Sequence, residues 1–267
     1  MDPSVNESAD PLGRAMYDHQ RGEPGTLRYR DGADTRDGHV EAYYFSPPSQ
    51  WAEATGSLLE RLASLDGPVL DAGCGAGQHA LWLARRGVDV TGIDVSPHAI
   101  RAARERGLED ARVVDVFELE AAFDPGRFRA VHAVGTQVGL AGSLAGVREL
   151  LASFARVTDE AGVAVVHNYD PAEVDGDLLG SRPDPRSGIA HRCFHLEYEP
   201  PLEAGDEDER TRVVGRTLHF LLFDPDRLAD ATIGTPWSVE EVVSMPDATY
   251  KAVLTKPGAD QPAGVNR

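Results

Sequence analysis

Lysine and cysteine are scarce in this 267-residue sequence, which has two of each, and positive charge is scarce as a whole. Lysine and arginine number 26 against 44 acidic residues, which gives a net charge of −18. So acidic a surface repels phosphates and anionic lipids, and this argues against a nucleic-acid or membrane partner. The charge also predicts a salt-adapted (halophilic) protein, because salt screens its self-repulsion, although an ordinary acidic protein is the alternative.

Long apolar runs are also missing, and none approaches the eighteen or so residues of a membrane span. The N-terminus lacks the basic-then-apolar pattern of a secretion signal. Cys74 and Cys193 lie far apart in the sequence, so we do not expect a disulfide framework. Two cysteines without such a framework agree with a reducing compartment. We therefore expect a cytoplasmic protein with one α/β domain and an elaboration, or two small domains.

The stretch 68–79 contains the clearest motif. Val69 and Leu70 indicate the end of a buried strand, and Gly73, Gly75 and Gly77 follow at every second position before a helical pattern begins. Strand, glycine turn and helix open a nucleotide-binding βαβ unit. Glycine suits such a turn because it adopts positive φ and has no Cβ between backbone and ligand.

The residues around the turn favour one ligand class. The third glycine of a dinucleotide fingerprint is replaced by Gln78, and Asp71 stands at the strand end. A pyrophosphate would be repelled by that carboxylate, whereas a ligand with an ammonium and a sulfonium would be attracted. An acid followed by GxGxG resembles the first motif of the class I S-adenosylmethionine (SAM)-dependent methyltransferases, whose cofactor carries both cations.

The next two predicted strands strengthen the resemblance. Residues 88–94 end in Asp94, and residues 111–116 contain Asp115. An acid at the end of the second strand accepts hydrogen bonds from ribose hydroxyls. The resemblance implies that Asp115 and the backbone of Val116 hold the adenine, while Asp71 and the glycine backbone hold the methionyl end. The implied cofactor-binding residues are Asp71, Gly73, Gly75, Gly77, Asp94, Val95, Asp115, Val116 and Gly135.

Hydrophobic periodicity predicts the fold. Helices are expected at 51–65, 97–106 and 143–157, and further strands at 128–134 and 162–167, which together indicate a parallel sheet wrapped on both faces. Residues 189–198 and 211–223 are expected to pair antiparallel across the acidic turn 203–209, followed by a helix at 224–234. A hairpin at 239–243 and 250–254 completes the prediction: a doubly wound α/β fold with a mostly parallel seven-stranded sheet, an antiparallel last strand and a small antiparallel insertion.

The expected domain organisation follows from these elements. Residues 1–50 are an N-terminal lid or a partly disordered segment, and residues 51–170 are the SAM-binding core. Residues 171–223 are an antiparallel insertion that acts as a substrate lid. Residues 224–257 return to the core sheet, and 258–267 are a tail.

Candidate substrate residues come from several segments, and most have a structural alternative. The alternative is packing for the aromatic residues 43–51, a capped turn for Gln137 and plain surface exposure for the arginines. Arg192 and Arg212 are candidates for binding a carboxylate, and one of residues 167–170 is a candidate base, but no catalytic residue is assigned. His191 and His195 share a strand face without a third ligand, so no metal site is expected. The candidate substrate residues are Tyr44, Trp51, Gln137, Asn168 and Arg192.

The resulting hypothesis is a SAM-dependent methyltransferase acting on a small molecule at oxygen, nitrogen or sulfur. Enzymes that methylate amino groups of nucleic-acid bases often carry an Asn/Asp-Pro-Pro-aromatic motif after the fourth strand, where this chain has Gly135 to Val138. A SAM-binding sensor or subunit without activity is one alternative. An NAD(P)-dependent oxidoreductase is another, against which Gln78 and Asp71 count. The acceptor and the oligomeric state stay open.

Overall fold

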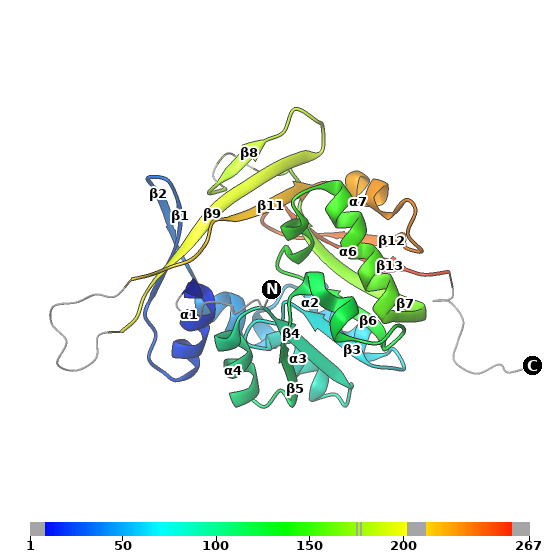
Figure 1. Ribbon diagram of the computed structural model, residues 1–267, viewed down its shortest axis with the longest axis horizontal. Coiled ribbons are helices and arrows are strands. Elements are labelled where there is room, and N and C mark those ends of the chain that lie inside the picture. The colour runs from blue at the N-terminus through cyan, green and yellow to red at the C-terminus, as the bar shows by residue number, and fades with distance from the viewer. Residues whose placement is uncertain (1–8, 175, 177, 202–211, 258–267) are drawn as a thin grey trace, which may run out of the picture.

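A seven-stranded sheet with helices on both faces forms the body of the protein (Figure 1). The computed structural model describes residues 9–174, 176, 178–201 and 212–257. In sheet order the strands are β12 (Ser238–Ser244), β13 (Thr249–Thr255), β7 (Thr158–Tyr169), β6 (Phe128–Ala133), β3 (Val69–Ala72), β4 (Val90–Asp94) and β5 (Asp110–Val113). The last strand, β13, runs antiparallel to β7 and β12, so the predicted fold class is confirmed.

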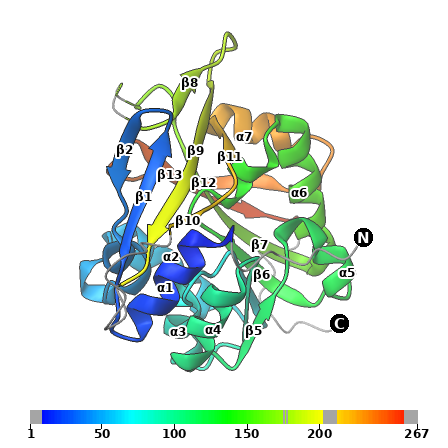
Figure 2. The same ribbon diagram turned by 60° about the vertical axis from the view of Figure 1, so that its left-hand side comes forward.

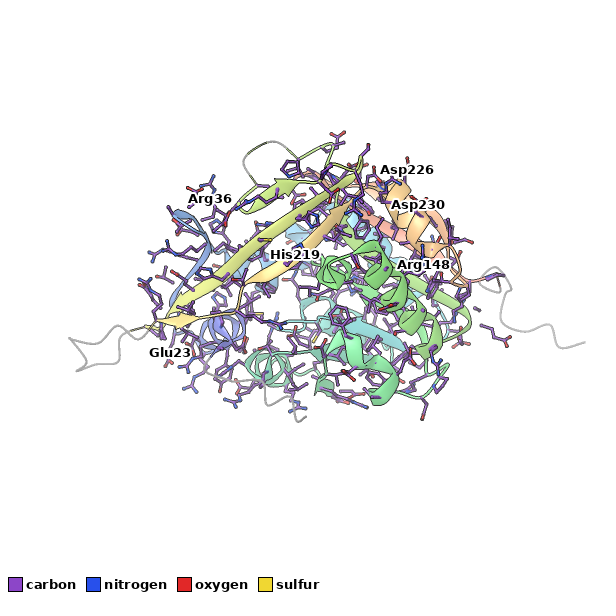
Figure 3. The ribbon with its side chains drawn as sticks, turned by 45° about the horizontal axis from the view of Figure 1, so that its top comes forward. Glu23, Arg36, Arg148, His219, Asp226 and Asp230 are labelled. Atoms are coloured by element: carbon purple, nitrogen blue, oxygen red, sulfur yellow. The ribbon has the colours of Figure 1, made fainter. Side chains whose placement is uncertain are left out.

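The helices divide between the two faces of this sheet. Helices α2 (Glu53–Ala63), α3 (Gln78–Ala84) and α4 (Pro97–Glu105) pack on one face, and α5 (Leu119–Ala122), α6 (Leu144–Val157) and α7 (Pro225–Thr232) on the other. Two of them begin at serine caps: Ser96 accepts from the N–H of Ala99, and Ser143 from that of Gly146. Helices α6 and α7 are also joined by a hydrogen bond from Arg148 to the carbonyl of Asp230, both labelled in Figure 3.

A second, antiparallel sheet is built around β9 (Ile189–Glu199). The predicted pairing within residues 189–223 is confirmed, because β11 (Leu218–Phe223) and the short β10 (Val213–Val214) both pair with β9. Three more strands join it: β1 (Thr26–Asp31), β2 (Asp34–Asp37) and β8 (Ser181–Pro183). The sequence did not predict β1 and β2. The predicted turn 203–209 and tail 258–267 lie outside the described residues.

Helix α1 (Pro11–Gln20) lies between this second sheet and α4 (Figure 2). Asp10 caps α1 by accepting from the N–H of Gly13, and its carboxylate also accepts from Ser96 and lies 3.2 Å from Nδ1 of His98. Because Ser96 and His98 begin α4, the N-terminal segment is attached next to the end of β4.

The few lysine and cysteine side chains contribute little to the surface. Both lysines are buried, with 7% and 9% of Lys251 and Lys256 exposed, so arginine and histidine supply the basic side chains on the surface of the described residues. Cys74 and Cys193 are free thiols. In the part of the chain that the structure describes, no helix is both long and apolar enough to cross a bilayer.

Candidate functional site

The glycine turn joins β3 to α3 and requires its glycines for backbone reasons. Gly73, Gly75 and Gly77 have φ angles of +78°, +54° and +80°, a region that other residues enter only with strain. Space is also limiting, because a Cβ at Gly73 would lie 2.4 Å from the side chain of Gln137. The turn thus has three residues in the left-handed region, and the segment that carries Gln137 approaches it closely.

Asp94, at the end of β4, holds this loop in place. Its Oδ2 accepts from the N–H of Gly75 at 3.0 Å, and its Oδ1 accepts from the N–H of Ser96 at 2.9 Å. Burial raises the pKa of Asp94 to about 6. Each carboxylate oxygen keeps a further acceptor site, so the side chain is able to bind two more donors.

Asp71, near the end of β3, already has a partner within the protein. Its side chain is buried, and its Oδ1 lies 2.8 Å from Nδ1 of His132 on the neighbouring strand β6. His132 is itself a core residue, with 1% of its surface exposed. One oxygen of Asp71 is therefore already engaged within the protein, and its predicted contact with a cofactor stays a prediction.

The ends of β4 and β5 combine acids with exposed apolar side chains. Asp115 follows β5, begins the 3₁₀ turn η4 (Val116–Glu118) and accepts from the N–H of Phe117 at 3.0 Å. Val116 is buried, whereas Val95 and Phe117 are 43% and 47% exposed. Apolar surface of this kind beside a carboxylate suits a flat, apolar ring with a polar edge, since such surface is otherwise unfavourable in water.

The N-terminal segment covers the glycine turn. A Cβ at Gly75 would lie 3.2 Å from the ring of Tyr44, in η2 (Glu41–Phe45), and 3.3 Å from Sδ of Met16 on α1. Arg106, just after α4, donates to the carbonyls of Tyr44 at 3.2 Å and Ala76 at 2.7 Å. Arg106 therefore ties the segment to the turn. Neither Met16 nor Arg106 was a sequence candidate, because only the folded chain brings them here.

Trp51, by contrast, is engaged in packing. Its indole Nε1 donates to the carbonyl of Ser46 at 3.2 Å. Its ring meets His79 edge-on at 5.0 Å and Trp82 at 6.3 Å between centroids. These contacts match the packing alternative for Trp51, whereas Tyr44 reaches the glycine turn.

The segment after β6 lines the other side of the turn. Gln137, which begins the 3₁₀ turn η5 (Gln137–Ala141), lies against Gly73, and a Cβ at Gly135 would be 3.7 Å from its Nε2. The N–H of Thr136 donates to Nδ1 of His167 at 3.0 Å. Burial lowers the pKa of His167 to about 3, so the ring is neutral and carries its proton on Nε2. His167 is therefore not a free base at Nδ1.

The two remaining substrate candidates lie further from the turn. Asn168 is fully buried, and its Nδ2 donates to the carbonyl of Leu221 at 3.2 Å, which joins β7 to β11. Arg192, on β9, donates through Nε to the carbonyl of Leu179 and lies over the ring of Tyr169. The structure thus brings Tyr44 and Gln137 to the turn and leaves Asn168 in a structural contact.

A buried lysine lies on the same face of the sheet as Asp71 and His132. Lys251, on β13, donates to Oγ1 of Thr55, and burial lowers its pKa to about 8. The Lys251 amine keeps its proton up to about pH 10.5 in the unfolded chain but only up to about pH 8 in the folded chain. The free energy of unfolding of the wild type therefore rises as the pH increases from about 8 to 10.5.

Replacing Lys251 with methionine should therefore stabilise the protein at pH 7 by about 2–3 kcal/mol, because it removes the cost of a buried charge. The free energy of unfolding, measured with urea from pH 7 to pH 10, checks this. The advantage of Lys251→Met should shrink above pH 8. An advantage that is absent, or independent of pH, would contradict the assignment of the buried ammonium.

Comparisons with known proteins agree with this geometry. Residues 69–162 match the family model described as "Methyltransferase domain". The ubiquinone biosynthesis O-methyltransferase of Xanthomonas campestris is 43% identical over 79 residues, 28% of this chain and 33% of that protein. The magnesium-protoporphyrin O-methyltransferase of Rhodobacter capsulatus is 39% identical over 72 residues, 26% and 32% of the two chains. The matched stretch thus spans about a third of these curated relatives.

Solved structures extend the likeness to almost the whole chain. A SAM-dependent methyltransferase from Bacteroides fragilis, solved with S-adenosylhomocysteine (SAH), aligns with a TM-score of 0.72 and 21% identity over 94% of this chain and 97% of that one. The sugar N-methyltransferase KedS8 from Streptoalloteichus aligns with a TM-score of 0.58 and 17% identity over 84% and 96%. The chain therefore has the fold of these SAM-dependent methyltransferase structures, and its residues 69–162 are similar to a methyltransferase domain.

Proposed function

We propose that this protein is an enzyme that transfers a methyl group from SAM to a small-molecule acceptor at oxygen, nitrogen or sulfur. The observation that carries the proposal is the left-handed glycine turn held by the half-buried carboxylate of Asp94, with Asp115 just after the next strand. The match of residues 69–162 to a methyltransferase domain supports it, as do the O-methyltransferase names of two partial relatives.

The residues present fit SAM. The free acceptor sites of Asp94 suit the two ribose hydroxyls, and Asp115 with the backbone of Val116 suits the adenine edge. Val95 and Phe117 offer apolar surface to the ring. The backbone of Gly73, Gly75, Gly77 and Gly135 and the negative charge of Asp71 suit the cationic methionyl end. A pyrophosphate at the turn would be repelled by the carboxylate of Asp71, which disfavours NAD(P).

SAM, when bound, supplies a methyl group already activated by its sulfonium. Positioning of the acceptor then provides much of the rate, and a strong catalytic base is not essential. Tyr44 and Met16 cover the turn and exclude water from it, and Gln137 offers an amide beside Gly73. His167 fixes the Gly135–Gln137 backbone through Thr136 rather than acting at Nδ1.

Turnover tests the proposal. The purified chain is incubated with methyl-labelled SAM and fractionated small metabolites, and formation of labelled product and SAH is measured. We expect acceptor-dependent SAH that is lost in Asp94→Ala, and no labelling of duplex DNA or tRNA. Tight SAH binding with no acceptor in any fraction would favour the sensor alternative, and labelled nucleic acid would refute the small-molecule assignment.

The net negative charge also bears on the cellular environment of the protein. We propose a cytoplasmic protein of a salt-adapted cell, because a chain with a net charge of −18 repels itself at low ionic strength. Raising KCl from about 0.1 M to 1 M shortens the screening length from about 10 Å to 3 Å. The melting temperature should then rise by about 5–10 °C, equivalent to a few kcal/mol. A melting temperature that is unchanged or lower in KCl would contradict the salt-adapted assignment.

A further inference from the structure

The second sheet presents an aromatic face built from three strands. Side chains alternate along β9, so Arg192 and Phe194 share one face, while His191 and Cys193 share the other. Phe194 stacks on Phe220 of β11 at 5.5 Å and meets Tyr29 of β1 at 5.2 Å between ring centroids. We call Tyr29, Phe194 and Phe220, with Tyr169 from β7, the aromatic wall. His219, labelled in Figure 3, belongs to the opposite face.

Contacts connect the aromatic wall to the glycine turn. Gln137 lies against Gly73, and its neighbour Thr136 is bonded to His167. The ring of His167 lies 6.3 Å from that of Tyr169, two residues further along β7. Tyr169 in turn lies 5.7 Å from the guanidinium of Arg192. A chain of neighbouring residues therefore leads from the turn, where the methyl donor is proposed to bind, to Tyr169 and Arg192.

Tyrosines near the glycine turn and in the aromatic wall are withdrawn from water. Burial raises the pKa of Tyr29, and the charge of Arg192 opposes this shift. Burial likewise raises the pKa of Tyr44, which covers Gly75, well above its usual value.

Arg192 differs from its basic neighbours in this sheet. Arg30 and Arg212 pair with Glu197, and Arg182 pairs with Asp31. Among the described residues, Arg192 has no carboxylate within ion-pair distance. Its Nε donates to the carbonyl of Leu179 at 2.9 Å, and its guanidinium lies 4.7 Å from the ring of Phe194. In so acidic a chain, a half-buried guanidinium without a counter-ion is available for an anion from outside.

We propose that the aromatic wall is the acceptor pocket and that the acceptor is an aromatic molecule carrying a carboxylate, which Arg192 binds. The inference rests on the proposed function and names the substrate class of that site. A planar guanidinium recognises a carboxylate through two parallel hydrogen bonds. The partly exposed rings of Tyr29, Phe220 and Tyr169, packed around the buried Phe194, offer apolar and stacking surface. If Arg192 holds the carboxylate, the other end of the acceptor points toward Gln137 beside the glycine turn.

Two probes of nearly equal shape test the proposal on the 267-residue chain: 2-naphthoate, which is anionic, and 2-naphthamide, which is neutral. Calorimetric titration should show naphthoate binding about 10- to 100-fold tighter, the range of a hydrogen-bonded charge pair. Arg192→Gln should abolish this preference and leave naphthamide affinity unchanged, and Arg192→Lys should retain part of it. Arg182→Gln is the matched control, because Arg182 pairs with Asp31 on a neighbouring strand, and should behave as wild type.

Equal binding of the two probes to the wild type, binding of neither at millimolar concentration, or an unchanged preference in Arg192→Gln overturns the proposal. SAH is titrated into the same samples and should bind wild type and Arg192→Gln equally. If SAH binds while the naphthoate preference is absent, the acceptor class is wrong and the proposed function stands. If the preference is present without SAH binding, the anion site stands and the proposed function fails.

Discussion

Replacing Asp94 with alanine is expected to weaken SAH binding by about 100-fold or more. The carboxylate offers acceptor sites to two ribose hydroxyls, and charge-assisted hydrogen bonds contribute about 1.5–3 kcal/mol each. It also holds the N–H groups of Gly75 and Ser96, so its loss loosens the loop itself. The melting temperature should change by only a few degrees, because removing a desolvated acid offsets part of the lost bonding. Calorimetric titration with SAH and a thermal scan measure the two effects.

The pH dependence of binding separates Asp94 from a general loss of structure. Its pKa is raised to about 6 by burial, and hydroxyl donors prefer the ionised form. Affinity for SAH should thus be constant above pH 7 and fall by up to tenfold per unit as the pH drops below about 6. Asp94→Asn should bind weakly with no such slope. Asp89→Ala, which removes an exposed acid at the other end of β4, is the control, and equal losses in both alanine variants would refute the ribose assignment.

A valine at Gly75 is expected to abolish cofactor binding, while a valine at Gly87 leaves it intact. Both glycines have positive φ, +54° and +84°, so both substitutions carry a similar backbone cost of about 1–2 kcal/mol. They differ in surroundings. The new side chain at Gly75 meets Tyr44 and Met16 and blocks close approach to the turn, whereas nothing lies within 4 Å of a Cβ at Gly87.

Parallel titrations with SAH and urea unfolding curves distinguish strain from obstruction. We expect similar losses of stability in the two variants and a loss of SAH binding in Gly75→Val alone. If Gly87→Val also loses binding, the effect is one of global strain. If Gly75→Val binds SAH as wild type does, the glycine turn is not the cofactor cradle.

The main sheet was predictable because each of its signals is local. The glycine turn, the serine caps of α4 and α6 and the alternation of short apolar runs with amphipathic helices all lie within a few residues of the elements they specify. The hairpin β12–β13 was predicted for the same reason. Local signals therefore gave the position of the three strand-end acids without any knowledge of the tertiary structure.

The N-terminal strands were not predictable in this way. In β1, of sequence TLRYRD, only Leu27 is buried, and charged residues interrupt the alternation. The partners that stabilise it, Glu197 and Glu199, lie about 170 positions later on β9, where they pair with Arg30 and Arg28. Pairing with β9 decides the conformation here, because its contacts outweigh a weak local preference.

Side-chain contacts were less predictable from the sequence than positions along the strands. The sequence placed Asp71 at the end of its strand, but only the register between β3 and β6 shows that His132 binds its carboxylate. Asn168 likewise lies at the predicted edge of the sheet, yet its amide is used to join β7 to β11. Such pairings depend on which strands are neighbours, and a single strand does not contain that information.

The most direct test of the account is a calorimetric titration of the wild-type chain with SAH and, separately, with NAD⁺ in the same high-salt buffer. Saturable one-to-one binding of SAH in the micromolar range, with no heat from NAD⁺, is the result that the site predicts. Binding of NAD⁺ without binding of SAH would contradict it, because the glycine turn would then accept a pyrophosphate despite the carboxylate of Asp71 and the replacement of the third fingerprint glycine by Gln78.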